Sequence, residues 1–274
     1  EMIRKYVDSD IDAVMQIWLN TNIQAHGFIS PDYWKNNFLE HHTLSQKRVT
    51  RIYIGNQFCH NLFPRKELLF QVLEKALENN LAVTLAFSYI RNHLLEEIDE
   101  LLQELEVWCQ SREKEAGKDQ EEIIVNDWAM PILLQGKPHL KPVLGVLLNK
   151  RRKDVRLPYK HGIGNHVDSL AENNLNCGFY QDYLKNTFDI QRFEFESCGY
   201  KVTIPDGHHS LHLPFFQTNT SQYCTLYAVC RYGDREKQKL PENCPKYCEQ
   251  KVFLYPKHLK MVGRYNSLFG YDEK

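Results

Sequence analysis

Between residues 49 and 150, short apolar segments alternate with amphipathic ones, and this alternation limits the fold more than any other feature of the sequence. RIYIGN is typical of a strand, and LAVTLAF is a nearly continuous apolar run of the kind buried on both faces of a parallel sheet. The intervening segment RKELLFQVLEKALENN carries an apolar stripe at helical spacing, formed by Leu68, Leu69, Val72, Leu73, Ala76 and Leu77. The pattern therefore predicts a β-α-β unit.

The same alternation continues along the chain. From Leu94 to Trp108 the apolar residues follow the helical period, and the polar segment SREKEAGKDQEE follows them. IIVNDW, PVLGVLLNK, RFEFES, KVTIP and HHSLHLPF are further strand candidates. Repeated units of this kind predict an α/β fold, namely a (β/α) barrel, complete or incomplete, with a doubly wound sheet as the competing topology.

We expect three parts in the chain: a head at 1–40, a linker at 41–48 and a body at 49–274. The head contains IRKYV, DSDIDAVMQIWLNTNIQ and SPDYWKNNF, which predict a short β-α-α appendage. It resembles the start of the GNAT acetyltransferases, but the turn (Q/R)-x-x-G-x-(G/A) that holds the pyrophosphate of coenzyme A in that family is missing. We therefore expect no acetyl-CoA binding by this chain.

Charge and hydropathy exclude several classes of protein. The formal net charge of -1 gives no whole-molecule attraction to nucleic acid or to an anionic membrane. The charged start EMIRKYVDSD and the lack of an apolar run of about 18 residues predict neither secretion nor a membrane span. We expect a cytoplasmic protein.

Eight cysteines in a reducing compartment are poor candidates for disulfides. Cys244 and Cys248 form a C-x3-C pair that can bring two sulfurs to one metal. Four thiolates can hold an iron–sulfur cluster or a structural zinc ion, and free buried thiols are the remaining alternative. Five cysteines gather in one stretch and favour a metal site: Cys198, Cys224, Cys230, Cys244 and Cys248.

Polar residues follow the predicted strands, where barrels of this class carry their sites. Asn126 and Asp127 are candidate catalytic residues, and an Asx turn is the structural alternative. A basic run follows a later strand and is either a site for an anion or a solvated loop; it contains Lys150, Arg151, Arg152, Lys153 and Arg156.

Alternation in RFEFE places Arg192, Glu194 and Glu196 on one side of a strand, as an internal ion network or as part of a site. His208, His209 and His212 are interpreted as structural. The sequence has no G-x-S-x-G elbow, H-E-x-x-H helix, Walker loop or dinucleotide fingerprint, so proteolysis has no recognisable nucleophile or zinc site.

Several of these segments together resemble the collagenase-like peptidases, peptidase family U-thirty-two, over residues 49–274. The resemblance rests on FC after the first strand, EIIVNDWAMPILL, PVLGVLLNKRRKDVR, RFEFE, LHLPF, and TSQYCTLYAVC followed by CPKYC. It implies a barrel-like domain and a [4Fe–4S] cluster, with zinc as the alternative metal. The implied ligands are Cys59, Cys224, Cys244 and Cys248, with Cys230 as the alternative to Cys224.

The resemblance implies oxygen-independent hydroxylation of an RNA base or a quinone-type ring, alone or with a heteromeric partner of the same family. A peptidase of the same fold is the second hypothesis. The third is a non-catalytic binding module stabilised by a metal. Cys109, Cys177 and Cys198 are expected to be structural.

Overall fold

The computed structural model describes residues 51–116, 120–155, 170–198, 201–213, 215–237, 239–241 and 243–272. The head and linker expected at 1–48 lie outside these residues. The chain divides into two compact units between Val143 and Leu144.

The first unit contains a four-stranded sheet in the order β1-β2-β3-β4. Its strands are β1 (Arg51–Gly55), β2 (Ala82–Ala86), β3 (Glu121–Val125) and β4 (Leu140–Leu144). Strand β2 runs parallel to both β1 and β3, with Leu85 opposite Ile54 and Ile123. The order follows the sequence without a reversal, unlike that of a doubly wound sheet.

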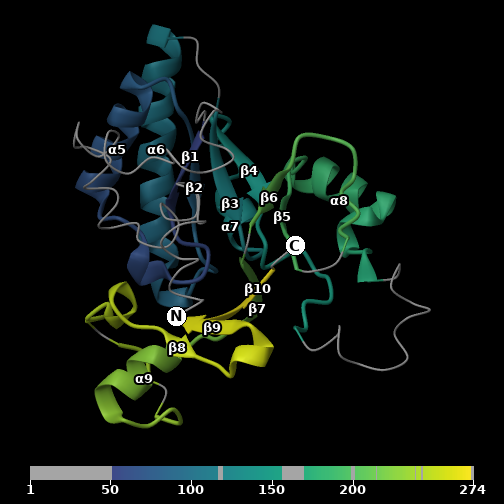
Figure 1. The fold of residues 1–274 in the computed structure, drawn as a ribbon. Helices are drawn as coiled ribbons and strands as arrows, with labels where there is room; N and C mark the ends of the chain where they lie inside the picture. Colours follow the sequence, from purple (N-terminus) through teal and green to yellow (C-terminus); the bar gives the residue numbers. More distant parts are fainter. Residues whose placement is uncertain are drawn as a thin grey trace. The chain divides into compact units, whose positions relative to one another are not determined.

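Helices α5 (Lys66–Glu78) and α6 (Leu95–Ala116) connect these strands and lie on one side of the sheet (Figure 1). Four residues of the apolar stripe predicted for α5 are buried, whereas Leu68 and Leu77 at its edges are half-buried. The Trp108 indole N–H of α6 donates to Glu74 of α5 at 2.8 Å. The short helix α7 (Met130–Leu133) follows β3. Both long helices and the first three strands confirm the predictions from periodicity.

Two strand predictions need correction. PVLGVLLNK contributes only its first residues to β4, because the backbone turns at Gly145, whose carbonyl accepts from the N–H groups of Leu148 at 3.1 Å and Asn149 at 3.3 Å. KVTIP was predicted as a strand and is irregular instead, with the Thr203 N–H donating to the Ala171 carbonyl.

The second unit has two sheets. Strands β5 (Glu194–Glu196) and β6 (Ser210–His212) lie in RFEFES and HHSLHLPF, where strands were predicted, and they pair in parallel. An antiparallel sheet has the order β7-β10-β9-β8. Its strands are β7 (Phe215–Thr220), β8 (Phe253–Leu254), β9 (Met261–Arg264) and β10 (Ser267–Tyr271).

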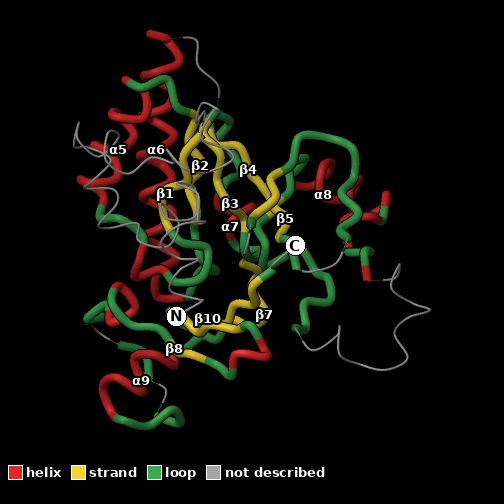
Figure 2. The backbone as a smooth tube through the Cα atoms, in the orientation of Figure 1, coloured by secondary structure: helices red, strands yellow, loops and turns green. Residues whose placement is uncertain are grey.

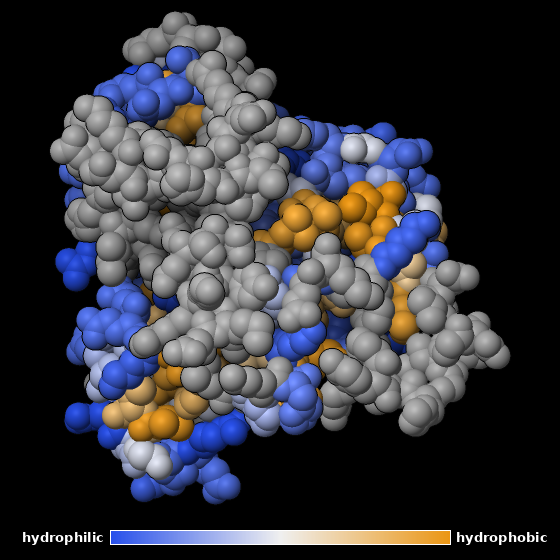
Figure 3. Space-filling model, viewed as in Figure 1, coloured by the Kyte–Doolittle hydropathy of each residue, from blue (hydrophilic) through white to orange (hydrophobic). Residues whose placement is uncertain are grey.

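Two helices complete the second unit, α8 (Gly178–Phe188) and α9 (Thr225–Tyr232). Much of the remaining chain in this unit is loop (Figure 2). Hydrophobic side chains gather at the surface near α8 and β6 (Figure 3), where Phe179, Leu211 and Leu213 are exposed.

Parallel strands joined by helices confirm the α/β class. The described strands form sheets of four, four and two strands, and over these residues no closed barrel is formed.

Candidate metal centre and basic cavity

Cys224 caps the first turn of α9. Its Sγ accepts a hydrogen bond from the Tyr227 N–H at 3.3 Å and donates to the Tyr265 carbonyl at 3.1 Å. The sulfur therefore lies beside the free N–H groups of a helix start, which stabilise a thiolate once the proton has left.

Burial and the neighbouring thiols affect the pKa of Cys224. Burial raises the pKa of Cys224 to about 11, Cys244 and Cys230 add to the increase, and the backbone N–H groups of Tyr227 and Leu226 oppose it. Thiolates repel one another in this way only when they are close together. We call Cys224, Cys230 and Cys244, whose charges affect one another, the thiol group.

Cys248 lies next to this group in the chain and is buried in the short helix η7 (Tyr247–Glu249). Helix η7 packs against α9, with the ring centroids of Tyr227 and Tyr247 6.4 Å apart. The Cys248 carbonyl also accepts from the Arg264 Nε–H at 2.9 Å. The fold therefore brings the segment with the C-x3-C pair against the helix that Cys224 caps.

The fourth implied ligand, Cys59, belongs to the first unit, where it precedes helix η1 (His60–Leu62). The Asn56 Oδ1 accepts from the N–H groups of Phe58 and Cys59, both at 2.9 Å, and this fixes the turn after β1. The assignment of Cys59 as a ligand stays a prediction.

The donor atoms of the thiol group fit a soft metal or an iron–sulfur cluster, because they are sulfurs whose mutual repulsion a cation would relieve. Within the described ranges, however, no three Cys, His, Asp or Glu side chains are placed to hold one metal ion. The thiols are thus neighbours rather than a preformed coordination shell.

Asn126 and Asp127 lie at the carboxyl end of β3, as predicted. The buried Asn126 amide donates to the Gln57 side chain at 3.2 Å and to the Phe87 carbonyl at 2.8 Å, so it ties together the ends of three strands. These contacts position the strand ends, and the catalytic role assigned to Asn126 stays a prediction.

The Asp127 carboxylate accepts hydrogen bonds from backbone N–H groups. Its Oδ1 accepts from Ala129 at 2.9 Å and Met130 at 3.0 Å, and its Oδ2 accepts from Ile90. This is the geometry of the Asx turn that the sequence offered as the alternative to catalysis.

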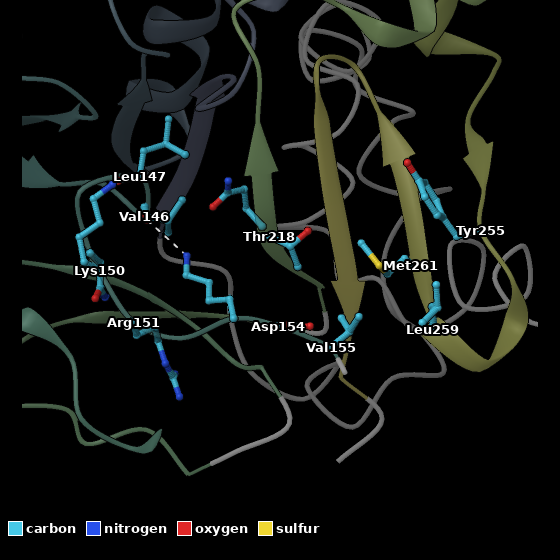
Figure 4. Close-up of a pocket in the computed structure, with 13 residues that line it drawn as sticks. Val146, Leu147, Lys150, Arg151, Asp154, Val155, Thr218, Tyr255, Leu259 and Met261 are labelled. Carbon is cyan, nitrogen blue, oxygen red and sulfur yellow. Dashed lines mark hydrogen bonds between the residues drawn. The ribbon is translucent and has the colours of Figure 1, made fainter. Parts of the chain in front are cut away.

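The basic run lies beside a cavity of about 610 Å³ in the second unit (Figure 4). Lys150, Arg151 and Lys153 line the cavity, whereas Arg152 is exposed and is not part of the lining. Arg156 lies outside the described residues. The fold therefore places three of the predicted cations at one cavity.

Sequence reasoning missed a buried pair in the second unit. His212 contacts the Glu194 carboxylate through Nε2, and both side chains are buried. Burial is the largest influence on the pKa of His212 and lowers it. The charges of Glu194 and Glu196 and the hydrogen bond that His212 donates to Glu194 outweigh burial, so the pKa is raised.

The pairing of β5 with β6 explains this contact. His212 lies opposite Glu196 in the ladder and next to Glu194 on the same face. The predicted alternation of Arg192, Glu194 and Glu196 is correct, and all three side chains are buried in an ion network. The contact depends on the parallel pairing of two three-residue strands, and the sequence pattern did not indicate this pairing.

The cysteines outside the implied ligand set lie in two environments. Cys109 and Cys198 are buried, whereas Cys177 is exposed before α8.

Comparisons with protein-family models, curated proteins and solved structures found no match to this chain. No helix among the described residues is long and apolar enough to cross a membrane.

Proposed function

We propose that this protein holds an iron–sulfur cluster and supports oxygen-independent hydroxylation of an RNA base or a quinone-type ring. The observation that supports the proposal is the packing of helix η7, which contains Cys248, against helix α9, whose first turn Cys224 caps. The resemblance to the collagenase-like peptidases over 49–274 adds the type of cluster and the type of reaction. We further propose that the sequential parallel strands of the first unit belong to an incomplete (β/α) barrel.

The proposed ligands are Cys59, Cys224, Cys244 and Cys248, with Cys230 as the alternative to Cys224. The α9 N–H groups and the Tyr265 carbonyl hold the Cys224 sulfur in place. When bound, an iron–sulfur cluster supplies one-electron transfer. Because the Cys224 thiol is protonated at neutral pH, binding must release its proton.

The basic run is the proposed contact for an acidic substrate, through Lys150, Arg151, Arg152 and Arg156. Arg151 and Lys150 line a cavity of suitable size for a ring-containing molecule. Asn126 and Asp127 are the proposed catalytic residues, and their hydrogen bonds to backbone groups would keep the carboxyl ends of the strands in place.

The test begins with protein purified without oxygen. We expect broad visible absorbance and about four irons and four sulfides per chain. Serine at Cys59, Cys224, Cys244 or Cys248 should remove both, whereas serine at Cys109, Cys177 or Cys198 should leave them intact.

Cys230 provides the sharpest control. Cluster loss in Cys230→Ser with retention in Cys224→Ser would move the ligand assignment by one cysteine. One zinc and no sulfide would overturn the redox proposal in favour of a metal-stabilised binding module. Cleavage of collagen-like peptides by the cluster-free protein would favour the peptidase.

A further inference from the structure

The cavity in the second unit has two different walls. One is the segment after β4, which contributes Leu147, Lys150 and Arg151, and the opposite one is formed by Tyr255, Leu259 and Met261 (Figure 4). Thr218 of β7 lies between them. The volume of about 610 Å³ is in the range that takes a molecule of drug size.

The first wall carries charge that the protein leaves unbalanced. Lys153 forms an ion pair with Glu196, so its charge is offset. Within the part of the chain that the structure describes, no carboxylate forms an ion pair with Lys150 or Arg151, whose side chains donate to backbone carbonyls instead. Asp154 is the one acid among the lining residues described, so Lys150 and Arg151 together face one carboxylate.

Arg151 is held in position before any ligand arrives. Its two terminal nitrogens donate to the carbonyls of Glu196 at 3.2 Å and Lys201 at 3.4 Å. Its Nε is buried and has no hydrogen-bond partner among the described residues. A fixed guanidinium with unused donors binds an oxyanion at a lower entropy cost than a mobile one.

The opposite wall offers apolar contact. Tyr255, Leu259 and Met261 are half-buried there, and Val155 adds a further apolar side chain. A ligand bound only by its charge would leave this wall in contact with water, whereas a ligand with an apolar body would cover it.

We infer that the cavity binds an amphipathic anion: an oxyanion head, carboxylate or phosphate, on Arg151 and Lys150, and an apolar body against Tyr255, Leu259 and Met261. The cavity shares no lining residue with the thiol group. The inference therefore needs no metal. It rests on the part of the proposed function that assigns the basic run to an acidic substrate, and dye binding can be measured whether or not a cluster is present.

Two dyes of nearly the same shape test the inference on the full chain. Anilinonaphthalene sulfonate carries an anionic head, and N-phenylnaphthylamine has the same rings without the charge. We expect saturable fluorescence with both dyes, with the sulfonate binding about ten-fold more tightly because of one charge-assisted contact.

Substitutions of single charged residues to glutamine measure the contribution of each charge to dye binding. Arg151→Gln should remove the ten-fold preference for the charged dye while leaving the neutral dye unchanged, and Lys150→Gln should reduce the preference in the same direction. Lys185→Gln is the matched control for Lys150→Gln, because this exposed lysine of α8 is not part of the lining. Far-ultraviolet circular dichroism shows whether each variant is folded, and Lys150→Gln keeps the test valid if Arg151→Gln is not.

Equal affinity of the two dyes, or an equal loss in Lys185→Gln and Lys150→Gln, would overturn the inference. Competition identifies the head. Octanoate and octyl phosphate should displace the dye whereas octanol should not, and the more effective competitor shows whether the site prefers a carboxylate or a phosphate.

Discussion

The buried glutamates of the two units have different kinds of partners. In the first unit, Arg51, the partner of Glu122, has a side chain 26% exposed, and His139, the partner of Glu106, is 22% exposed. Each cation therefore keeps contact with water while its glutamate is buried.

In the second unit both members of each pair are enclosed. The Lys153 side chain is 10% exposed and that of Glu196 4%, and the values for His212 and Glu194 are 8% and 0%. Removing one partner here would leave a charge that water cannot reach. Similar ion pairs therefore contribute to stability in different ways, depending on whether water can replace the lost partner.

The largest difference between the units should appear when a cation is removed. His212→Leu should lower the free energy of unfolding by about 3–5 kcal/mol, because the Glu194 charge remains buried. Arg51→Gln should cost about 1 kcal/mol, since Glu122 keeps the Thr84 hydroxyl at 2.8 Å. Urea unfolding followed by circular dichroism measures both.

Tryptophan fluorescence reports on unfolding of the chain before the second unit, because no tryptophan follows Trp128. Equal losses in the two variants would mean that water reaches the second network as easily as the first.

The same contrast explains what the sequence could predict. In the first unit apolar periodicity placed α5, α6 and the first three strands, because these elements bury continuous apolar faces. In the second unit the contact of His212 with Glu194 depends on pairing between three-residue strands, which periodicity does not determine.

The candidate site shows the same division. Clustering in the sequence predicted the thiol group, because Cys224 to Cys248 span a short segment that folds back on itself. The basic run was predicted to be either a site for an anion or a solvated loop. The apolar wall of the cavity opposite it could not be predicted. Tyr255 and Met261 are distant in sequence, and only the return of the chain through β8 and β9 brings them opposite Arg151.

Glycine replacements should show how far each unit can adjust. A Cβ on Gly55 would lie 2.3 Å from the Ala86 carbonyl oxygen, and φ is +114°. Gly55→Ala should cost about 2–4 kcal/mol, because the backbone of a parallel sheet cannot move away. A Cβ on Gly270 would meet the side chains of Phe216 and Val155, which can rotate, so Gly270→Ala should cost about 1–3 kcal/mol.

Thermal melts of both glycine variants measure the difference. A larger loss for Gly270→Ala would show that the second unit is packed as rigidly as the first.

The pH dependence should identify the enclosed network. The pKa of His212 is raised above its ordinary value in the folded state by Glu194 and Glu196, against the effects of burial and Arg192. The resulting stabilisation is complete below the pKa of the unfolded chain, at pH about 6.5, and is lost as pH rises through the pKa of the folded state. The loss amounts to about 1.4 kcal/mol for each pH unit that separates these two pKa values.

Unfolding free energies between pH 5.5 and 8.5, which bracket roughly the ordinary histidine range, should therefore fall with pH in the natural protein more than in His212→Leu. The same slope in both proteins would assign the dependence to other groups.

The smallest losses of stability should come from replacing side chains that accept hydrogen bonds from loop backbone. The losses should be similar in the two units. Asp127→Ala and Asn173→Ala each remove acceptors of backbone N–H groups, from Ala129 and Met130 in one case and from Leu175 in the other. Each should cost about 1–2 kcal/mol in urea unfolding. Unchanged stability of Asp127→Ala together with lost activity would instead favour catalysis.

The raised pKa of Cys224 also determines how the metal-free protein meets oxidants and alkylating reagents. With a pKa of about 11, on the order of one molecule in ten thousand carries the reactive thiolate at pH 7. Sulfenic acid and mixed disulfides form from the thiolate, so this sulfur is slow to be damaged while no metal is bound.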